Sequence, residues 1–285
     1  MTSLALPAAA AFSTGLWDEA LRRQAALARF GAALLALTAA TLLLQLLDER
    51  TLASGVNVWV KPAKFAFSIA VFSFTACWFF GLVREERRAS LLMRGTAAVL
   101  VVSATLELAY VLYQAAQAGE SHFNFSSHFT IAMYSLMGVF AVLLTGTTLT
   151  LAWEIARRPA EGIAPELRWA AVTGLVLTFV LGAGLGGYMS AQTGHSVGAT
   201  GGAVPLFGWN RSGGDLRVAH FLGIHAEQAI PLLAVLLAPL GPALRRAGIV
   251  LGTAAYCALT FAIFFQAVAG RPLLPIWCGG VDPVA

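Results

Sequence analysis

Charged residues are scarce in this chain of 285 residues, and their scarcity excludes most classes of soluble protein. Asp, Glu, Lys and Arg make up 11% of the residues, hydrophobic residues make up 58%, and the mean hydropathy is +0.76. Soluble domains carry about 25% charged residues, so this composition indicates an integral membrane protein. The net charge of +4 comes mainly from arginines in predicted cytoplasmic turns. Because no aromatic residues are interleaved among them, we expect no binding of nucleic acid.

Cysteine is rare, and the sequence motifs that define common enzyme classes are missing. The three cysteines, Cys77, Cys257 and Cys278, cannot form a disulfide framework, and none lies in a CxxC or CxxCH context that would predict covalent haem attachment. The motifs GxSxG and HExxH do not occur. The sequence therefore leaves open whether the protein is an enzyme.

Long apolar runs, by contrast, recur seven times along the chain. A helix needs about 20 residues to cross a bilayer, at a rise of roughly 1.5 Å per residue. Lipid offers no partners to unpaired backbone groups, so each crossing has to be helical. The predicted spans are residues 28–47, 58–83, 95–118, 127–152, 169–190, 217–239 and 248–269. We predict an all-α, polytopic membrane protein with a seven-transmembrane-helix bundle.

Arginine is concentrated on one side of these predicted spans. Cytoplasmic flanks of membrane helices accumulate Lys and Arg, and arginine-rich segments precede the first span and follow the second, fourth and sixth. They contain Arg22, Arg23, Arg29, Arg84, Arg87, Arg88, Arg94, Arg157, Arg158, Arg168, Arg245 and Arg246. This pattern predicts a multi-pass protein of the cell membrane, which we place in a bacterial inner membrane, with a cytoplasmic amino terminus and an extracytoplasmic carboxyl terminus.

The same pattern divides the chain into three predicted parts. Residues 1–27 form a cytoplasmic segment with an amphipathic interfacial helix, because apolar and charged residues separate onto different faces there. Residues 28–270 form the seven-helix transmembrane domain. Residues 271–285 form an extracytoplasmic tail.

Polar side chains form stripes on the extracytoplasmic halves of two predicted spans. In the second span, Lys61 and Lys64 are three residues apart and share one helical face. In the third span, Glu107, Tyr110 and Gln114 fall within an arc of roughly 80°, at about 100° per residue. A charged side chain that faces lipid near the midplane costs about 2.5 to 3.5 kcal/mol. We therefore expect both stripes to face protein or water.

The sixth predicted span begins with DLRVAHFLGIHAEQ, an unusually polar stretch for a membrane helix. Its polar residues are Asp215, Arg217, His220, His225, Glu227 and Gln228. Asp215 is predicted to cap the amino end of this helix, and His225 lies at a depth similar to that of Glu107. We expect spans two, three and six to converge on a cavity that opens outward, with Glu107 and His225 as its catalytic residues. The alternative is that each polar side chain hydrogen-bonds a neighbouring helix.

One kind of ligand for such a cavity is haem or a divalent metal ion, in a redox or membrane-embedded enzymatic role. Neutral imidazoles are the commonest metal ligands, and histidines of different helices can meet in a bundle core. His220 and His225 are about 140° apart around a helix, so each would need a partner on another helix. The predicted metal ligands are His128, His220 and His225, and the predicted cofactor-binding residues are Lys61, Lys64, Tyr110, Gln114, Arg211, Arg217, Gln228 and Arg271.

The alternative is a transporter, channel or receptor for a small anionic or protonatable solute, a quinone or a lipid headgroup. The same cations would bind it, and Glu107 and the histidines would carry protons. The lack of internal repeats and of paired broken helices counts against transport. A third hypothesis is a zinc hydrolase, but His220 and His225 do not have the HxxxH spacing that would place both imidazoles on one face of a helix. The predicted partners are the lipid bilayer and a small-molecule or lipid ligand, and the sequence also allows a homo-oligomer.

Overall fold

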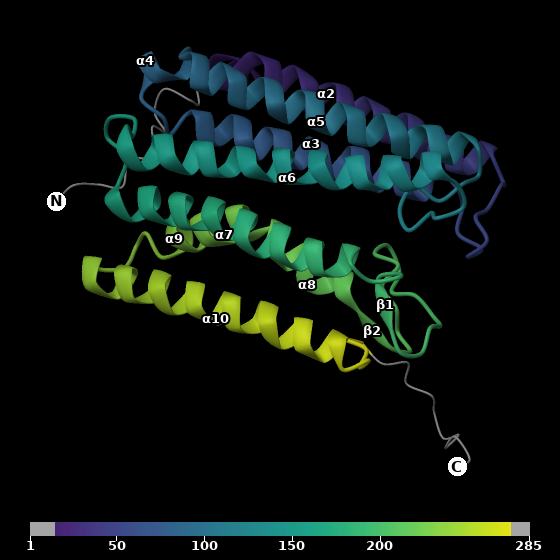
Figure 1. Cartoon of the computed structure of the whole chain (residues 1–285). Helices are drawn as coiled ribbons and strands as arrows, with labels where there is room; N and C mark the ends of the chain where they lie inside the picture. Colours follow the sequence, from purple (N-terminus) through teal and green to yellow (C-terminus); the bar gives the residue numbers. More distant parts are fainter. Residues whose placement is uncertain (1–14, 275–285) are drawn as a thin grey trace.

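The computed structural model describes residues 15–274, and this part of the chain is a helical bundle (Figure 1). Six of its helices are long and apolar enough to cross a membrane, and a bent pair of shorter helices raises the number to as many as seven. The helices are α2 (Leu16–Leu47), α3 (Val60–Phe80), α4 (Glu85–Arg88), α5 (Leu91–Ala116), α6 (His128–Arg157), α7 (Pro165–Ser190), α8 (Leu216–Ile224), α9 (Ala226–Leu236) and α10 (Pro242–Val268). The prediction of an all-helical chain with several helices long and apolar enough to cross a membrane is confirmed.

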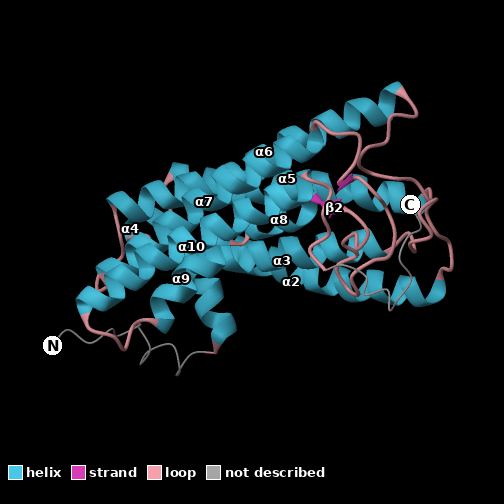
Figure 2. Ribbon diagram, turned by 90° about the horizontal axis from the view of Figure 1, so that it is seen from below, coloured by secondary structure: helices cyan, strands magenta, loops and turns pink. Residues whose placement is uncertain are grey.

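The long helices lie side by side along one common direction (Figures 1 and 2). Helix α2 packs on α3, α3 on α5, α5 on α6 and α6 on α7, and α7 then packs on α8 and α9. Helix α10 covers α8 and α9 on the far side of the bundle. One end carries α4, and the opposite end carries the two short strands β1 (Ser196–Val197) and β2 (Gly214–Asp215), which pair antiparallel. We call these the α4 end and the hairpin end.

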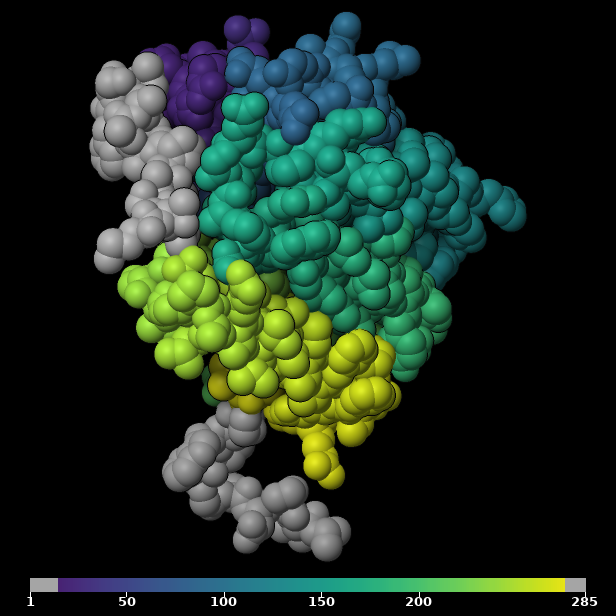
Figure 3. Space-filling view, turned by 90° about the vertical axis from the view of Figure 1, so that its left-hand side faces the viewer, coloured from purple at the N-terminus to yellow at the C-terminus, as the bar shows by residue number. Residues whose placement is uncertain are grey.

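The α4 end is held together by a buried carboxylate and two arginines. Glu154 of α6 has no exposed surface and lies 3.0 Å from Arg87 and 2.8 Å from Arg158. Its pairing with Arg87 fixes the turn that contains α4 against α6. Figure 3 views the molecule from this end. Leu27, Phe80 and other fully buried apolar residues form the core just inside this end. The α4 end is therefore packed and ion-paired.

The first helix contains a break that separates its first two turns from the long apolar part. Gln24 has non-helical backbone angles (φ −159°, ψ 94°). Before the break, the Arg23 guanidinium lies 3.8 Å from the centre of the Trp78 ring and donates to the Trp78 carbonyl at 2.9 Å. The thiol of Cys77 donates to the Ala20 carbonyl at 3.2 Å. The described half of the predicted interfacial segment thus packs against α3, while residues 1–14 and the tail 275–285, with Cys278, lie outside the described residues.

The sixth predicted span differs from the expectation of one continuous helix over 217–239. Helices α8 and α9 meet at His225, and their axes differ by 55°. His225 has φ −97° and ψ 8°, outside the ordinary helical range. Residue 225 follows Leu216 by nine positions, so the break lies about 14 Å along the helix from its start. This distance is close to half the thickness of a bilayer's hydrocarbon core, which is roughly 30 Å.

Candidate functional site

The break at His225 is stabilised by side chains of two neighbouring helices, α7 and α10. The hydroxyl of Thr178 on α7 accepts a hydrogen bond from the Glu227 amide at 2.9 Å and donates to the Ile224 carbonyl at 3.5 Å. The hydroxyl of Tyr256 on α10 donates to the Leu222 carbonyl. An unpaired backbone group in the membrane interior costs several kcal/mol, so these bonds allow the helix to be interrupted at this depth.

Glycines let α7 approach the break closely. A β-carbon at Gly174 would lie 2.8 Å from the Ala226 carbonyl oxygen, and one at Gly223 would lie 3.0 Å from the backbone of Leu181. Pro231, inside α9, has no amide and therefore cannot donate to the carbonyl one turn earlier. The glycines and the proline together favour two half-helices here.

Four side chains at the break form a connected hydrogen-bonded group, which we call the break cluster: Thr75, His225, Glu227 and Gln228. The Gln228 amide nitrogen donates to the Glu227 carboxylate at 3.0 Å and to the Thr75 hydroxyl of α3 at 3.1 Å. The Gln228 amide oxygen lies 3.1 Å from Nδ1 of His225. An amide oxygen can only accept, so Nδ1 carries the hydrogen and Nε2 of His225 is left as an acceptor. Glu227 itself is only 1% exposed.

A second polar group, which we call the Lys61 cluster, lies at the start of α3: Lys61, Glu107, Tyr110, Gln114, Glu120 and His122. Lys61 is within electrostatic reach of Glu107 and Glu120 and also of Arg217 on α8. Glu107 is 5% exposed, and within residues 15–274 its Oε1 atom has no hydrogen-bond partner. Gln114 donates to the Tyr110 hydroxyl at 2.6 Å. Glu107 is the buried acceptor left open in this cluster.

His122 is the member of the Lys61 cluster that lies outside the helices. Its ring is packed edge-on between Phe65 of α3, at 5.6 Å, and Tyr134 of α6, at 5.9 Å. Burial first, and then the Lys61 ammonium, lower the pKa of His122 to about 3. The imidazole is therefore neutral at physiological pH, and its Nδ1 lies 3.1 Å from the Ser121 hydroxyl.

Glu107 and His225 lie at similar distances from the ends of their helices, but the two clusters are not directly bonded to each other. Glu107 precedes the end of α5 at Ala116 by nine residues, about 14 Å, as His225 follows the start of α8. In the described part of the chain, no hydrogen bond or ion pair joins Glu107 to His225. Helix α3 serves both, with Lys61 facing Glu107 and Thr75 bound to the break cluster. The predicted convergence of spans two, three and six on one cavity stays a prediction.

The predicted metal ligands face different surroundings. His220 lies 3.1 Å from the Gly182 carbonyl through Nδ1, and its ring fills the space that a β-carbon at Gly186 would occupy. His225 is bonded to Gln228, whereas His128 is an exposed residue at the start of α6. Among residues 15–274, no group of three or more His, Cys, Asp or Glu side chains is placed to hold a metal ion. The described residues therefore provide no such set of side chains to bind the predicted haem or metal.

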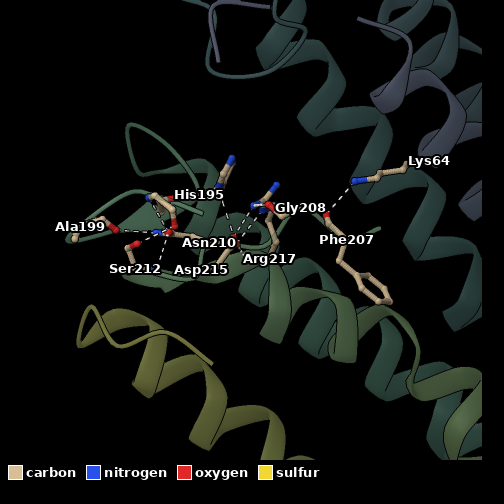
Figure 4. Close-up of polar contacts among 11 residues, drawn as sticks. Lys64, His195, Ala199, Phe207, Gly208, Asn210, Ser212, Asp215 and Arg217 are labelled. Atoms are coloured by element: carbon tan, nitrogen blue, oxygen red, sulfur yellow. Dashed lines mark hydrogen bonds and ion pairs between the residues drawn. The ribbon is translucent and has the colours of Figure 1, made fainter. Parts of the chain in front are cut away.

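Two of the cations predicted to bind a ligand, Lys64 and Arg217, bind the backbone of the 191–215 loop (Figure 4). Lys64 donates to the Phe207 carbonyl at 3.0 Å, and Arg217 donates to the Gly208 carbonyl at 2.7 Å. Arg217 also forms an ion pair with Asp215, which caps α8 as predicted by accepting from the Arg217 amide at 3.0 Å. In the same loop, Arg211 donates to the Leu274 carbonyl at 3.4 Å. Arg271 is exposed just beyond α10.

His195 lies beside this network. Its Nδ1 is 3.9 Å from the Asp215 carboxylate. Burial is the largest cause that lowers the pKa of His195, the nearby Arg217 adds to it, and Asp215 opposes it. A neutral His195 does not compete with Arg217 for the ion pair with the Asp215 carboxylate.

The side chains that stabilise the break from other helices, Thr75, Thr178 and Tyr256, were not predicted from the sequence. Each lies in an apolar run and has no charged neighbour along its own helix face. Gly223 and Pro231 flank the break and were the available signal that the sixth span would be interrupted.

Comparison of the chain with protein-family models, curated proteins and solved structures gives no match.

Proposed function

We propose that this chain is a proton-coupled membrane transporter for a small anionic or protonatable solute. The pathway enters at the hairpin end, which the arginine pattern predicts to be extracytoplasmic. It passes the Lys61 cluster and reaches the break cluster within the membrane. Of the functions that the sequence predicts, this one uses both clusters.

The observation that carries the proposal is the break in the sixth span. Transporters commonly bind solutes and coupling ions near the midplane, where discontinuous helices expose backbone groups and half-helix ends. Here α8 and α9 meet at 55° at about that depth, and hydrogen bonds with the Thr178 and Tyr256 hydroxyls stabilise the interruption. In a continuous helix these backbone groups would bond one another. The break instead requires two specific polar side chains, Thr178 and Tyr256, to bond them.

The break cluster provides groups that can accept and release a proton. Glu227 is fully enclosed, and its described side-chain partner is the neutral amide of Gln228. Ionisable groups inside a membrane are rare, and they commonly mark proton or ion pathways. His225 offers a free acceptor at Nε2, on the other side of the same amide. Gln228 thus links a carboxyl group and an imidazole, the two side-chain types most suited to proton transfer.

The Lys61 cluster provides the groups that would bind the solute. The Lys61 ammonium offers a cation, and Oε1 of Glu107 offers an acceptor without a partner among residues 15–274. A buried polar atom without a partner costs about 1 to 3 kcal/mol. A solute that accepts from Lys61 and donates to Glu107 would recover that free energy, so a binding role accounts for both side chains.

The test is proton movement in liposomes that contain the purified protein and an internal pH-sensitive dye. Inorganic phosphate, succinate and glycine are added outside one at a time, as probes of an anion, a dicarboxylate and a zwitterion. We expect at least one of them to acidify the interior, and the Glu227→Gln variant to lose this response. Glu161→Gln, a change at an exposed acid in the loop between α6 and α7, is the matched control. The proposal is overturned if no probe moves protons, or if both variants respond equally.

A further inference from the structure

We infer that the turn formed by residues 204–209 is the outer gate of this pathway, latched shut by Lys64 and Arg217. This inference rests on the proposed function for the identity of the pathway, and it concerns how that pathway is closed. We call residues 204–209 the gate turn. Its closed position in Figure 4 is held by side chains from two different helices, α3 and α8.

The gate turn is a self-contained unit of backbone. The Val204 amide donates to the Trp209 carbonyl at 2.8 Å, and the Gly208 amide donates to the Val204 carbonyl at 2.7 Å. Leu206, at its tip, has a φ of +67°, which is uncommon for a residue other than glycine, and its side chain is 84% exposed. A strained and exposed apolar tip is not explained by packing, and strain of this kind occurs in segments that move or bind.

The gate turn stands above the break cluster at the end of a column of aromatic rings. Phe207 and Trp209 stack with their centres 4.4 Å apart, and both meet the Phe221 ring edge-on, at 5.8 and 5.7 Å. The Phe221 ring in turn lies 4.3 Å from the His225 ring. The column therefore fills the route from the hairpin end to the imidazole at the break, and the turn carries its two outermost rings.

The attachments of the gate turn differ from those of the loop around it. The flanking loop is held by β1 and β2 and by Asn210, whose amide donates to the Asp215 carboxylate at 2.8 Å. The described polar attachments of the turn to the helices are the bonds from Lys64 and Arg217 to two of its carbonyls. Gly201 is tied to the flanking loop through Asn210 and Ser212, and Gly202, with a φ of +58°, follows it and gives the backbone conformational freedom just before the turn. Breaking these two hydrogen bonds and sliding the Phe207 and Trp209 rings off Phe221 would open the column while the flanking loop stays in place.

Binding of a ligand at the Lys61 cluster would weaken the bonds that hold the gate turn to Lys64 and Arg217. Lys64 lies one helical turn from Lys61, and Arg217 is within electrostatic reach of both lysines. An anionic group that arrives beside Lys61 would compete with the Phe207 and Gly208 carbonyls for these cations. The arrival of the solute would thereby loosen the gate turn.

The experiment measures the access of water-soluble reagents to the break, which does not depend on transport. Cys77, Cys257 and Cys278 are replaced by alanine, His225→Cys is introduced, and the reconstituted protein is treated from the hairpin side with a membrane-impermeant cationic methanethiosulfonate. We expect Lys64→Met to raise the labelling rate about tenfold, and Phe207→Ala, which shortens the column, to raise it similarly. Arg50→Met is the control, because Arg50 is an exposed cation of the same end that binds Asp48 and not the turn.

Two outcomes overturn the inference. One is equal labelling in Lys64→Met, Phe207→Ala and the parent, in protein whose cysteine reacts fully once denatured. The other is the same increase in Arg50→Met, which would indicate general loosening. If Lys64→Met speeds labelling but none of phosphate, succinate or glycine moves protons, the gate stands and the transport proposal fails.

Discussion

The hydroxyl of Thr178 is the group on which the broken span depends most, and its removal gives a quantitative prediction. The Thr178→Val change keeps the shape of the side chain and removes one acceptor and one donor. The Glu227 amide, now 2.9 Å from the hydroxyl, would be left buried without a partner. Such a group costs about 1 to 3 kcal/mol. The 3.5 Å bond to the Ile224 carbonyl is at the limit of hydrogen bonding and contributes little.

We therefore expect Thr178→Val to lower the free energy of unfolding by about 2 kcal/mol. The measurement is tryptophan fluorescence during titration of the purified protein from mild detergent into sodium dodecyl sulfate. Thr148→Val is the matched control, because Thr148 is also buried but its hydroxyl donates only to the Thr145 carbonyl of its own helix. That variant should differ from the parent by less than about 0.5 kcal/mol. Equal unfolding curves for the two variants would refute the account of how the break is stabilised.

Three further predictions concern other parts of the molecule. Glu154→Gln should destabilise the protein by about 1 to 3 kcal/mol in the same titration, less than for a fully buried pair because Arg87 and Arg158 reach solvent. His122 has a folded pKa of about 3 against about 6.5 when unfolded, so stability should fall by about 2 kcal/mol between pH 6.5 and pH 5, and His122→Gln should remove that part of the slope. The haem or metal predicted from the sequence is tested by an absorbance spectrum and elemental analysis; a Soret band lost in His220→Ala or His225→Ala would establish haem, and a colourless, metal-free protein would rule out both cofactors.

The helices could be predicted from the sequence because their signal is local. Apolar runs of about 20 residues located the membrane helices to within a few residues, although α7 and α10 begin earlier than expected, at Pro165 and Pro242. Proline suits the first turn of a helix, and this preference can be read directly from the sequence. The cap at Asp215 was predicted from the same kind of local preference at a helix end.

The break at His225 could not be predicted with the same rules, because the groups that stabilise it lie far away in the chain. Thr178 and Tyr256 come from other helices, and a threonine in an apolar run looks the same whether it bonds its own helix or another. Gly223 and Pro231 hinted at an interruption but did not define its position.

The roles of Lys64 and Arg217 were predicted only in part. Their charge and their place at the hairpin end followed from helical spacing. Their partners are backbone carbonyls of the gate turn, and the course of a glycine-rich loop is not encoded in a periodic pattern. Cations expected to hold a ligand therefore hold the chain itself in this conformation.

The most direct test of the transport account uses the Glu107→Gln variant, because Oε1 of Glu107, in the Lys61 cluster, has no hydrogen-bond partner among residues 15–274. Solute-dependent proton uptake and bound metal should be measured on the same preparations of parent and variant. The account predicts uptake in the parent, its loss in Glu107→Gln, and no change with Glu161→Gln. Undiminished uptake in a correctly folded Glu107→Gln protein would contradict it.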